Sequence, residues 1–128
     1  MKMKTHLPAT VAPPASNFAH GFSVDGAERW LHISGQVGIT PDGTLSSDID
    51  EQMAQTFRNI ASVLADADMS LDNLVKLTVF LTDTAHIGAY REGRDAALDG
   101  RCCASTLLVV SALASPDWLV EVEAIAAA

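Results

Sequence analysis

The sequence predicts a single α+β domain in which two helices pack on one face of a mixed β-sheet. Its 128 residues suffice for one hydrophobic core, and 48% hydrophobic with 19% charged residues is close to the composition of an average globular domain. Strand-like and helix-like segments follow one another in the order ββαβαββ. Two helices on one face would leave the other face of the sheet uncovered, so we expect self-association to cover it.

Two strand-like segments come first, at 18–24 and 29–39. Asp25-Gly26 between them is a turn signal, so we expect the two segments to pair as a hairpin. Residues 1–17 are rich in proline and alanine and are predicted to form an N-terminal arm outside the core of the 1–128 domain.

An amphipathic helix is predicted from Asp48 to about Ala67. Asp48 and Glu51 have the spacing of a capping box, which marks a helix N-terminus. Apolar residues then recur at steps of three and four and form one stripe: Ile49, Met53, Phe57, Ile60 and Leu64. Such a stripe must face a sheet or another helix.

The second half of the chain supplies three strands and a helix. The strand at 74–81 alternates an apolar face with a mixed one that carries Lys76, Thr78 and Phe80. A helix is predicted to begin near the cap Asp83 and to end before Gly100. Strands at 105–111 and 119–125 follow, separated by a turn that contains Pro116 and Asp117.

Charge and hydrophobicity exclude several classes of partner. Sixteen acidic and eight basic residues give a net charge of −8, which repels phosphate backbones, so no nucleic-acid partner is expected. No apolar stretch approaches the roughly 18 residues of a membrane helix, so no membrane association is expected either. The charged start Met1–Lys4 is followed by prolines rather than an apolar segment, so we do not expect secretion.

The only two cysteines, Cys102 and Cys103, are adjacent, and a disulfide between neighbours would close a strained ring. We therefore expect free thiols and a reducing, cytoplasmic location, and the chain offers no ligand set for a metal. A thiolate near a histidine could act as a nucleophile. None of the histidines has a partner motif, so small buried hydrophobic residues are the favoured interpretation of both cysteines.

Three separated blocks resemble the reactive-intermediate deaminase (Rid/YjgF) family, also labelled the L-PSP endoribonuclease family. They are WLHISGQ at 30–36, VKLTVFLTD at 75–83 and LVEVEAI at 119–125. The resemblance extends from about Ala12 to the C-terminus. It implies a chorismate-mutase-like fold of the bacillus type and a homotrimer whose sheets form an inner barrel. It also implies small-molecule clefts at the subunit interfaces, with no cofactor.

The resemblance assigns a catalytic role to Glu121. In active relatives an arginine pairs with the carboxylate of a 2-imino acid, and a glutamate at the position of Glu121 handles the attacking water. Glu121 and Glu123 alternate with valines, so both carboxylates point to the same side of the strand. On this pattern alone an exposed polar face is the favoured interpretation of the two glutamates, and only the family resemblance favours the catalytic role of Glu121.

The arginine of active relatives is missing. It should stand immediately before Ser105-Thr106, where this chain has Ala104. Alanine carries no charge and no donor, and losing a bidentate ion pair in a partly buried cleft costs about 2 to 5 kcal/mol of binding. The departure argues against ordinary 2-imino acid deamination.

Further substrate-binding positions follow from the resemblance. Phe18 stands where relatives often have Tyr, and Arg91 stands where active relatives have Asn. Arg91 could supply the missing cation from the helix side. Alternatively it is a solvated helix residue near the acidic Glu92 and Asp95.

A glycine and a threonine complete the predicted binding positions. Gly35 resembles the rim of the family's cleft, where glycine admits a ligand close to the backbone, but a strand glycine could also mark a β-bulge. The amide of Thr106 could donate to an anion.

Three functions remain open at this point. The first is a hydrolase acting on an imine or enamine, with Glu121 handling water. The second is a trimeric protein that binds a small metabolite without turnover. The third, ribonuclease activity, conflicts with the net charge of −8 and the absence of a basic stretch.

Overall fold

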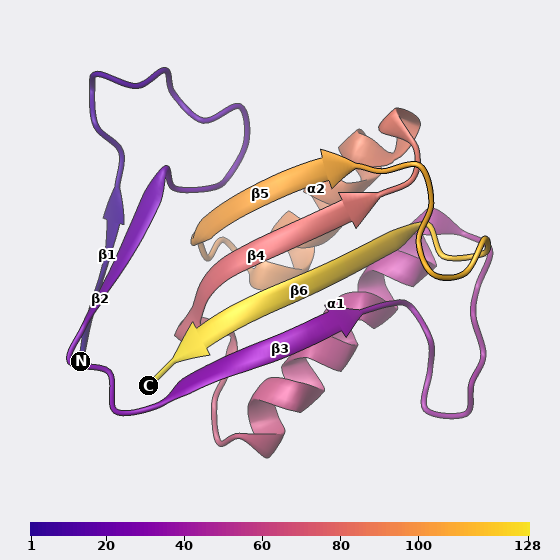
Figure 1. Cartoon of the computed structure of the whole chain (residues 1–128), viewed down its shortest axis with the longest axis horizontal. Helices are drawn as coiled ribbons and strands as arrows, with labels where there is room; N and C mark the ends of the chain where they lie inside the picture. The colour runs from indigo at the N-terminus through magenta and orange to yellow at the C-terminus, as the bar shows by residue number, and fades with distance from the viewer.

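A four-stranded mixed sheet with two helices behind it forms the body of the computed structural model, which describes residues 1–128 (Figure 1). The strands lie in the order β3 (Trp30–Gln36), β6 (Val120–Ala127), β4 (Leu74–Leu81) and β5 (Ala104–Val109). β5 runs parallel to β4, and the other neighbours are antiparallel. The helices α1 (Ile49–Asp66) and α2 (Ile87–Leu98) pack on one face, so the predicted α+β class is confirmed. Neither helix has the length and hydrophobicity needed to cross a membrane.

The N-terminal strands pair differently from the prediction. β1 (Lys2–His6) and β2 (Gly21–Asp25) form a separate two-stranded antiparallel sheet, so a strand not in the predicted order precedes the rest. The expected hairpin between β2 and β3 is wrong. Gly26 turns the chain at a φ of 74°, but the N–H groups of Glu28 and Arg29 then donate to Ala128 O at 2.8 and 2.9 Å. These two hydrogen bonds draw β3 alongside β6 instead of β2.

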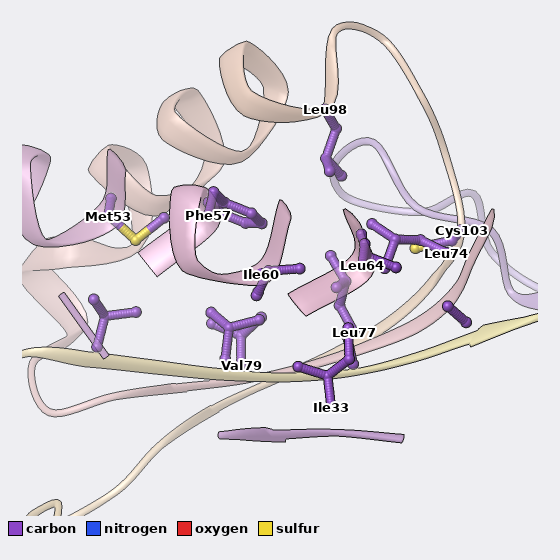
Figure 2. Packing of buried hydrophobic residues seen from close by; sticks show 14 of the residues in the cluster. Ile33, Met53, Phe57, Ile60, Leu64, Leu74, Leu77, Val79, Leu98 and Cys103 are labelled. Atoms are coloured by element: carbon purple, nitrogen blue, oxygen red, sulfur yellow. The ribbon is translucent and has the colours of Figure 1, made fainter. Parts of the chain in front are cut away.

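The first helix forms where its local signals place it. The Asp48 carboxylate accepts a hydrogen bond from the Glu51 N–H at 3.0 Å, which satisfies a donor at the helix N-terminus. The predicted stripe packs against the sheet, and Figure 2 shows Phe57, Ile60 and Leu64 above Leu77 and Val79. Burial of this stripe supplies most of the attraction between the helix and the sheet.

The second helix begins one turn later than its cap. The Asp83 side chain accepts from the Ala85 N–H at 2.9 Å and starts a short 3₁₀ turn, Thr84–His86, from which α2 continues. The chain leaves α2 through Asp99 and Gly100, both with left-handed φ, as expected for a glycine-terminated helix.

The face of the sheet opposite the helices is uncovered in Figure 1, and we call it the outer face. Val120 and Val122 of β6 are fully buried toward the helices, so the intervening Glu121 points to the outer face together with Glu123. On β4 the same alternation places Lys76, Thr78 and Phe80 on the outer face.

A buried glutamine ties the start of β6 to α1. The Gln52 side chain is fully buried, and its Nε2 donates to Ser46 O at 2.8 Å and to Asp117 O at 2.9 Å. Its Oε1 accepts from the Leu119 N–H at 2.9 Å. Gln52 therefore fixes the turn that enters β6, two residues before Glu121.

Gln52→Leu is expected to lower the free energy of unfolding by about 3 kcal/mol, because it removes three hydrogen bonds of a fully buried side chain, two of them to the half-buried residues Ser46 and Leu119. Urea unfolding followed by circular dichroism measures this change. Gln55→Leu on the same helix should cost less than about 1 kcal/mol, since Gln55 bonds only to side chains of its own helix. Equal losses in the two variants would show that Gln52 has no special role.

Candidate active site

Glu121 and Gly35 lie together on the outer face. β3 and β6 are paired, and their register shifts between Ile33 and Gln36, so Ser34 and Gly35 form a bulge. A Cβ atom added to Gly35 would lie 2.7 Å from Cδ of Glu121 and would overlap its carboxylate. Only a residue without a side chain lets the carboxylate cross the β3 backbone here. Gly35 therefore lies in a β-bulge, and the group that comes close to its backbone is the Glu121 carboxylate, while the close approach of a ligand stays a prediction.

The rest of the outer face around Glu121 is polar. Glu121 is half-buried and stands opposite Phe80 of β4, whereas Glu123 is exposed and stands opposite Thr78. Beside them a hollow of about 240 Å³ is lined by the following residues: His32, Ile33, Ser34, Lys76, Thr78, Glu123, Ala124 and Ile125. A carboxylate on this surface can keep water within reach and take a proton from it.

The segment that should have carried arginine starts β5. Ala104 and Thr106 pair with Lys76 and Thr78 of β4, so they lie on the outer face, while Ser105 faces the helices. Lys76 is the cation nearest to Ala104 in the sheet, and its Nζ donates to Thr106 Oγ1 at 2.7 Å. Position 104 itself offers an incoming anion neither charge nor a donor.

A second hollow, of about 270 Å³, lies on the helix side of β5, and we call it the edge pocket. Its lining consists of Ala15, Ser16, Phe18, Tyr90, Arg91, Arg94, Ser105 and Leu107. The Ala19 N–H donates to Cys103 O at 3.0 Å, which holds the neighbouring Phe18 against the start of β5. The edge pocket thus brings together Phe18, Arg91 and Ser105 of the predicted binding residues.

The predicted site residues form two groups in a single chain. Glu121 and Gly35 lie on the outer face at β6 and β3, and Ala104 and Thr106 also face outward, from β5. The edge pocket lies behind β5, with β4 between β5 and β6. One chain therefore does not place the carboxylate and the edge pocket in one cleft.

Arg91 was the candidate for the missing cation in the sequence analysis, and Arg101 is a further arginine close to position 104 in the sequence. Arg91 is exposed on α2, lines the edge pocket and makes no ion pair with Glu92 or Asp95. Arg101 instead pairs with Asp72, with Nε 2.6 Å from Oδ1, and lies by another hollow that contains the two cysteines.

Two residues of the edge pocket were not predicted. Arg94 is only 3% exposed, and the centre of its guanidinium lies 5.5 Å from the centroid of the Tyr90 ring. Burial raises the pKa of Tyr90 to about 12, and nearby Arg94 and Ser105 only partly oppose this rise. The available signal was the spacing Tyr90, Arg94, Leu98, which puts an arginine in the buried stripe of a helix.

The cysteines behave as small apolar residues. Cys103 is 6% exposed, and burial raises the pKa of its thiol to about 11. Burial also raises the pKa of Cys102, which is half-buried. Neither thiol has the lowered pKa of a nucleophile.

Alkylation by iodoacetamide is expected to be slow for Cys103 at pH 8, because only about one in a thousand of its thiols is then ionised. The rate should rise with pH toward an apparent pKa near 11. Mass spectrometry of a Cys102→Ser variant isolates Cys103. Rapid modification of the folded variant at pH 8 would contradict its burial.

The fold and the two groups of site residues define an α+β domain with an uncovered sheet face and a pocket at the sheet edge. One solved structure with this architecture is a protein of unknown function of the conserved Rid family from Yersinia pestis, YyfB. It superposes with a TM-score of 0.90 at 29% identity, over 100% of both chains. Escherichia coli TdcF, solved with bound serine, gives a TM-score of 0.75 at 25% identity over 90% of this chain and 91% of TdcF.

The sequence comparison identifies the family. Residues 9–128 match the family model described as Endoribonuclease L-PSP, so the chain belongs to this family, which is the Rid/YjgF family. A mouse 2-iminobutanoate/2-iminopropanoate deaminase is 32% identical over 124 residues, 95% of this chain and 86% of the mouse protein. With three other curated relatives, from yeast and Aquifex aeolicus, the match spans only 54% to 59% of their length.

Proposed function

We propose that the protein hydrolyses a small imine or enamine, with Glu121 positioning the attacking water. The observation that carries this proposal is the half-buried Glu121 carboxylate lying across the Gly35 bulge on the outer face. The relationship to a mouse protein named as an imine deaminase supports the reaction class.

The proposed reaction needs one group that handles protons. Glu121 accepts a proton from water while the oxygen attacks the imine carbon and the C=N electron pair moves to nitrogen, and the carboxylic acid then gives this proton to nitrogen to form a carbinolamine. Glu121 next takes the proton of the carbinolamine hydroxyl group and passes it to the amine as the C=O bond forms and the C–N bond breaks. The products are ammonia and a carbonyl compound, and Glu121 is regenerated as a carboxylate.

We further propose that three copies of the chain assemble and complete the site. β3 and β5 are the two edges of the sheet, so a cyclic arrangement of copies brings the β5 edge of one chain to the β3 edge of the next. That arrangement covers the outer face, where Trp30 is 53% exposed and Leu108 is 41% exposed. It also brings the edge pocket of one chain toward Glu121 and Gly35 of its neighbour. The free thiols favour a cytoplasmic location for this assembly.

A second candidate function is binding without turnover. It is favoured by Ala104, which removes the guanidinium from the segment that holds the substrate in active relatives. The first β5 residues then retain only Ser105, Thr106 and backbone groups for a ligand.

Product formation separates the two candidates. Small imines are generated in place from amines or amino acids by an oxidase, and carbonyl product and ammonia are followed by NMR and a coupled assay. The hydrolase proposal expects product faster than the uncatalysed rate and in proportion to protein concentration. Saturable binding of the imine precursor or product, with no acceleration for any imine, would instead support the binding protein.

A further inference from the structure

The strongest unassigned feature is a buried tyrosine hydroxyl group beside a buried arginine in the edge pocket. Tyr90 is 1% exposed, and its hydroxyl group has no partner with hydrogen-bond geometry, although Ser105 and Arg94 lie near it. Nη2 of Arg94 also makes no hydrogen bond, although it lies 3.0 Å from Asp95 Oδ1 and so forms an ion pair there. Buried polar groups in folded proteins nearly always have partners, so the Tyr90 hydroxyl group indicates a missing partner, and Arg94 keeps N–H groups beyond those that face Asp95 and Ser16.

Arg94 is held in place by its other contacts. Its Nε donates to Asp95 Oδ1 at 3.1 Å, and its Nη1 approaches Ser16 Oγ at 3.4 Å. The exposed carboxylate of Asp95 thus lies close to both Nε and Nη2, with Oδ1 3.1 and 3.0 Å away, and fixes the guanidinium plane. A guanidinium fixed in this way loses little freedom when it binds a planar anion.

The charges around the pocket favour an anion. Arg91 and Arg94 both line it, and Asp95 is the one carboxylate in contact with Arg94. Ser105 adds a hydroxyl group from β5, and Phe18 and Leu107 add apolar walls. The volume of about 270 Å³ is enough for a molecule of several non-hydrogen atoms, since one water occupies about 30 Å³.

We propose that the edge pocket binds the carboxylate of a small organic acid through Arg94 and Tyr90. This deepens the proposed function, because it names an anionic ligand class for the half of the site that Ala104 leaves without a cation. The anion lies on the helix side of β5, whereas position 104 faces the outer side. The carboxylate is therefore held at a different point from the one that an arginine at position 104 would serve.

Binding of butanoate, with butanamide as its uncharged counterpart, tests this proposal without any turnover. NMR titration of the wild-type protein is expected to show saturable shifts of α2 and β5 amides with butanoate and none with butanamide. Arg94→Met should weaken butanoate binding at least about 30-fold. Tyr90→Phe should weaken it about 10-fold, since the loss is one hydrogen bond to a charged group.

Two control variants sharpen the result. Arg94→Lys keeps the charge but not the planar fork, so its affinity should fall between those of wild type and Arg94→Met. Arg58→Met removes an exposed arginine of α1 and should change the affinity by less than about twofold. If Arg94→Met does not fold, Tyr90→Phe and the comparison with butanamide decide the question.

The proposal is overturned if folded wild-type protein does not bind butanoate, if butanamide binds as well, or if Tyr90→Phe and Arg94→Met keep full affinity. Failure of the hydrolase proposal is a separate result. Butanoate binding that depends on Arg94, together with no faster hydrolysis of any imine, would support carboxylate binding in the edge pocket. It would contradict only the catalytic role of Glu121.

Discussion

Glu121→Gln is expected to lower kcat for imine hydrolysis by about 10² to 10⁴, because the amide cannot take the proton from water. Glutamine keeps the size of the side chain and can still lie across Gly35, so the fold and ligand affinity should remain. Release of ammonia at saturating imine measures the effect on kcat alone.

Glu123→Gln is the matched control for this variant. Glu123 projects from the same strand to the same outer face, two residues away, but it is exposed and stands opposite Thr78. Its replacement removes the same charge and should leave kcat within about twofold. If the two variants lose activity equally, the effect comes from the charge of the outer face and not from a water-positioning group at 121.

Ala104→Arg is expected to raise kcat/KM for 2-iminobutanoate by at least about 30-fold, the lower limit for a bidentate ion pair in a partly buried cleft. The added guanidinium would project from the first residue of β5 on the outer face. The resemblance places the carboxylate of a 2-imino acid beside this position. Lys76 stands beside this position, and its charge should reduce the gain.

Ala104→Lys separates charge from geometry, since lysine cannot make the bidentate contact and should give a smaller gain. Ala112→Arg adds the same charge at an exposed residue outside the sheet and should give none. A wild-type protein already as active on 2-iminobutanoate as Ala104→Arg would show that the alanine is no obstacle.

The sequence predicted the elements whose signals are local. The cap and apolar stripe of α1 come from residues within a few turns of one another, and the strand at 74–81 has the bounds of β4. The pairing of β2 could not be predicted from its turn, because the deciding hydrogen bonds run from Glu28 and Arg29 to Ala128, about a hundred residues further on.

Of the candidate site, the sequence could predict only residues that lie in or beside the blocks that resemble the family. Those blocks identify Glu121 and Gly35, and the structure brings them into contact. Arg94 was missed because its helix contains two glycines and has a weak apolar pattern, so the spacing Tyr90, Arg94, Leu98 did not stand out as a buried stripe. The separation of the two groups by strand β4 depends on which way each side chain faces and on the sheet order, which no local pattern encodes.

The proposed site takes Glu121 from one chain and the edge pocket from its neighbour, and subunit mixing is the most direct test of this arrangement. Glu121→Gln and Arg94→Met chains, each with little activity as a pure assembly when the imine concentration is well below KM, are unfolded together in equal amounts and refolded. About a quarter of the wild-type activity should return, because a random mixture gives a quarter of the sites both intact residues. A mixture that stays as inactive as its parents would contradict a site shared between chains.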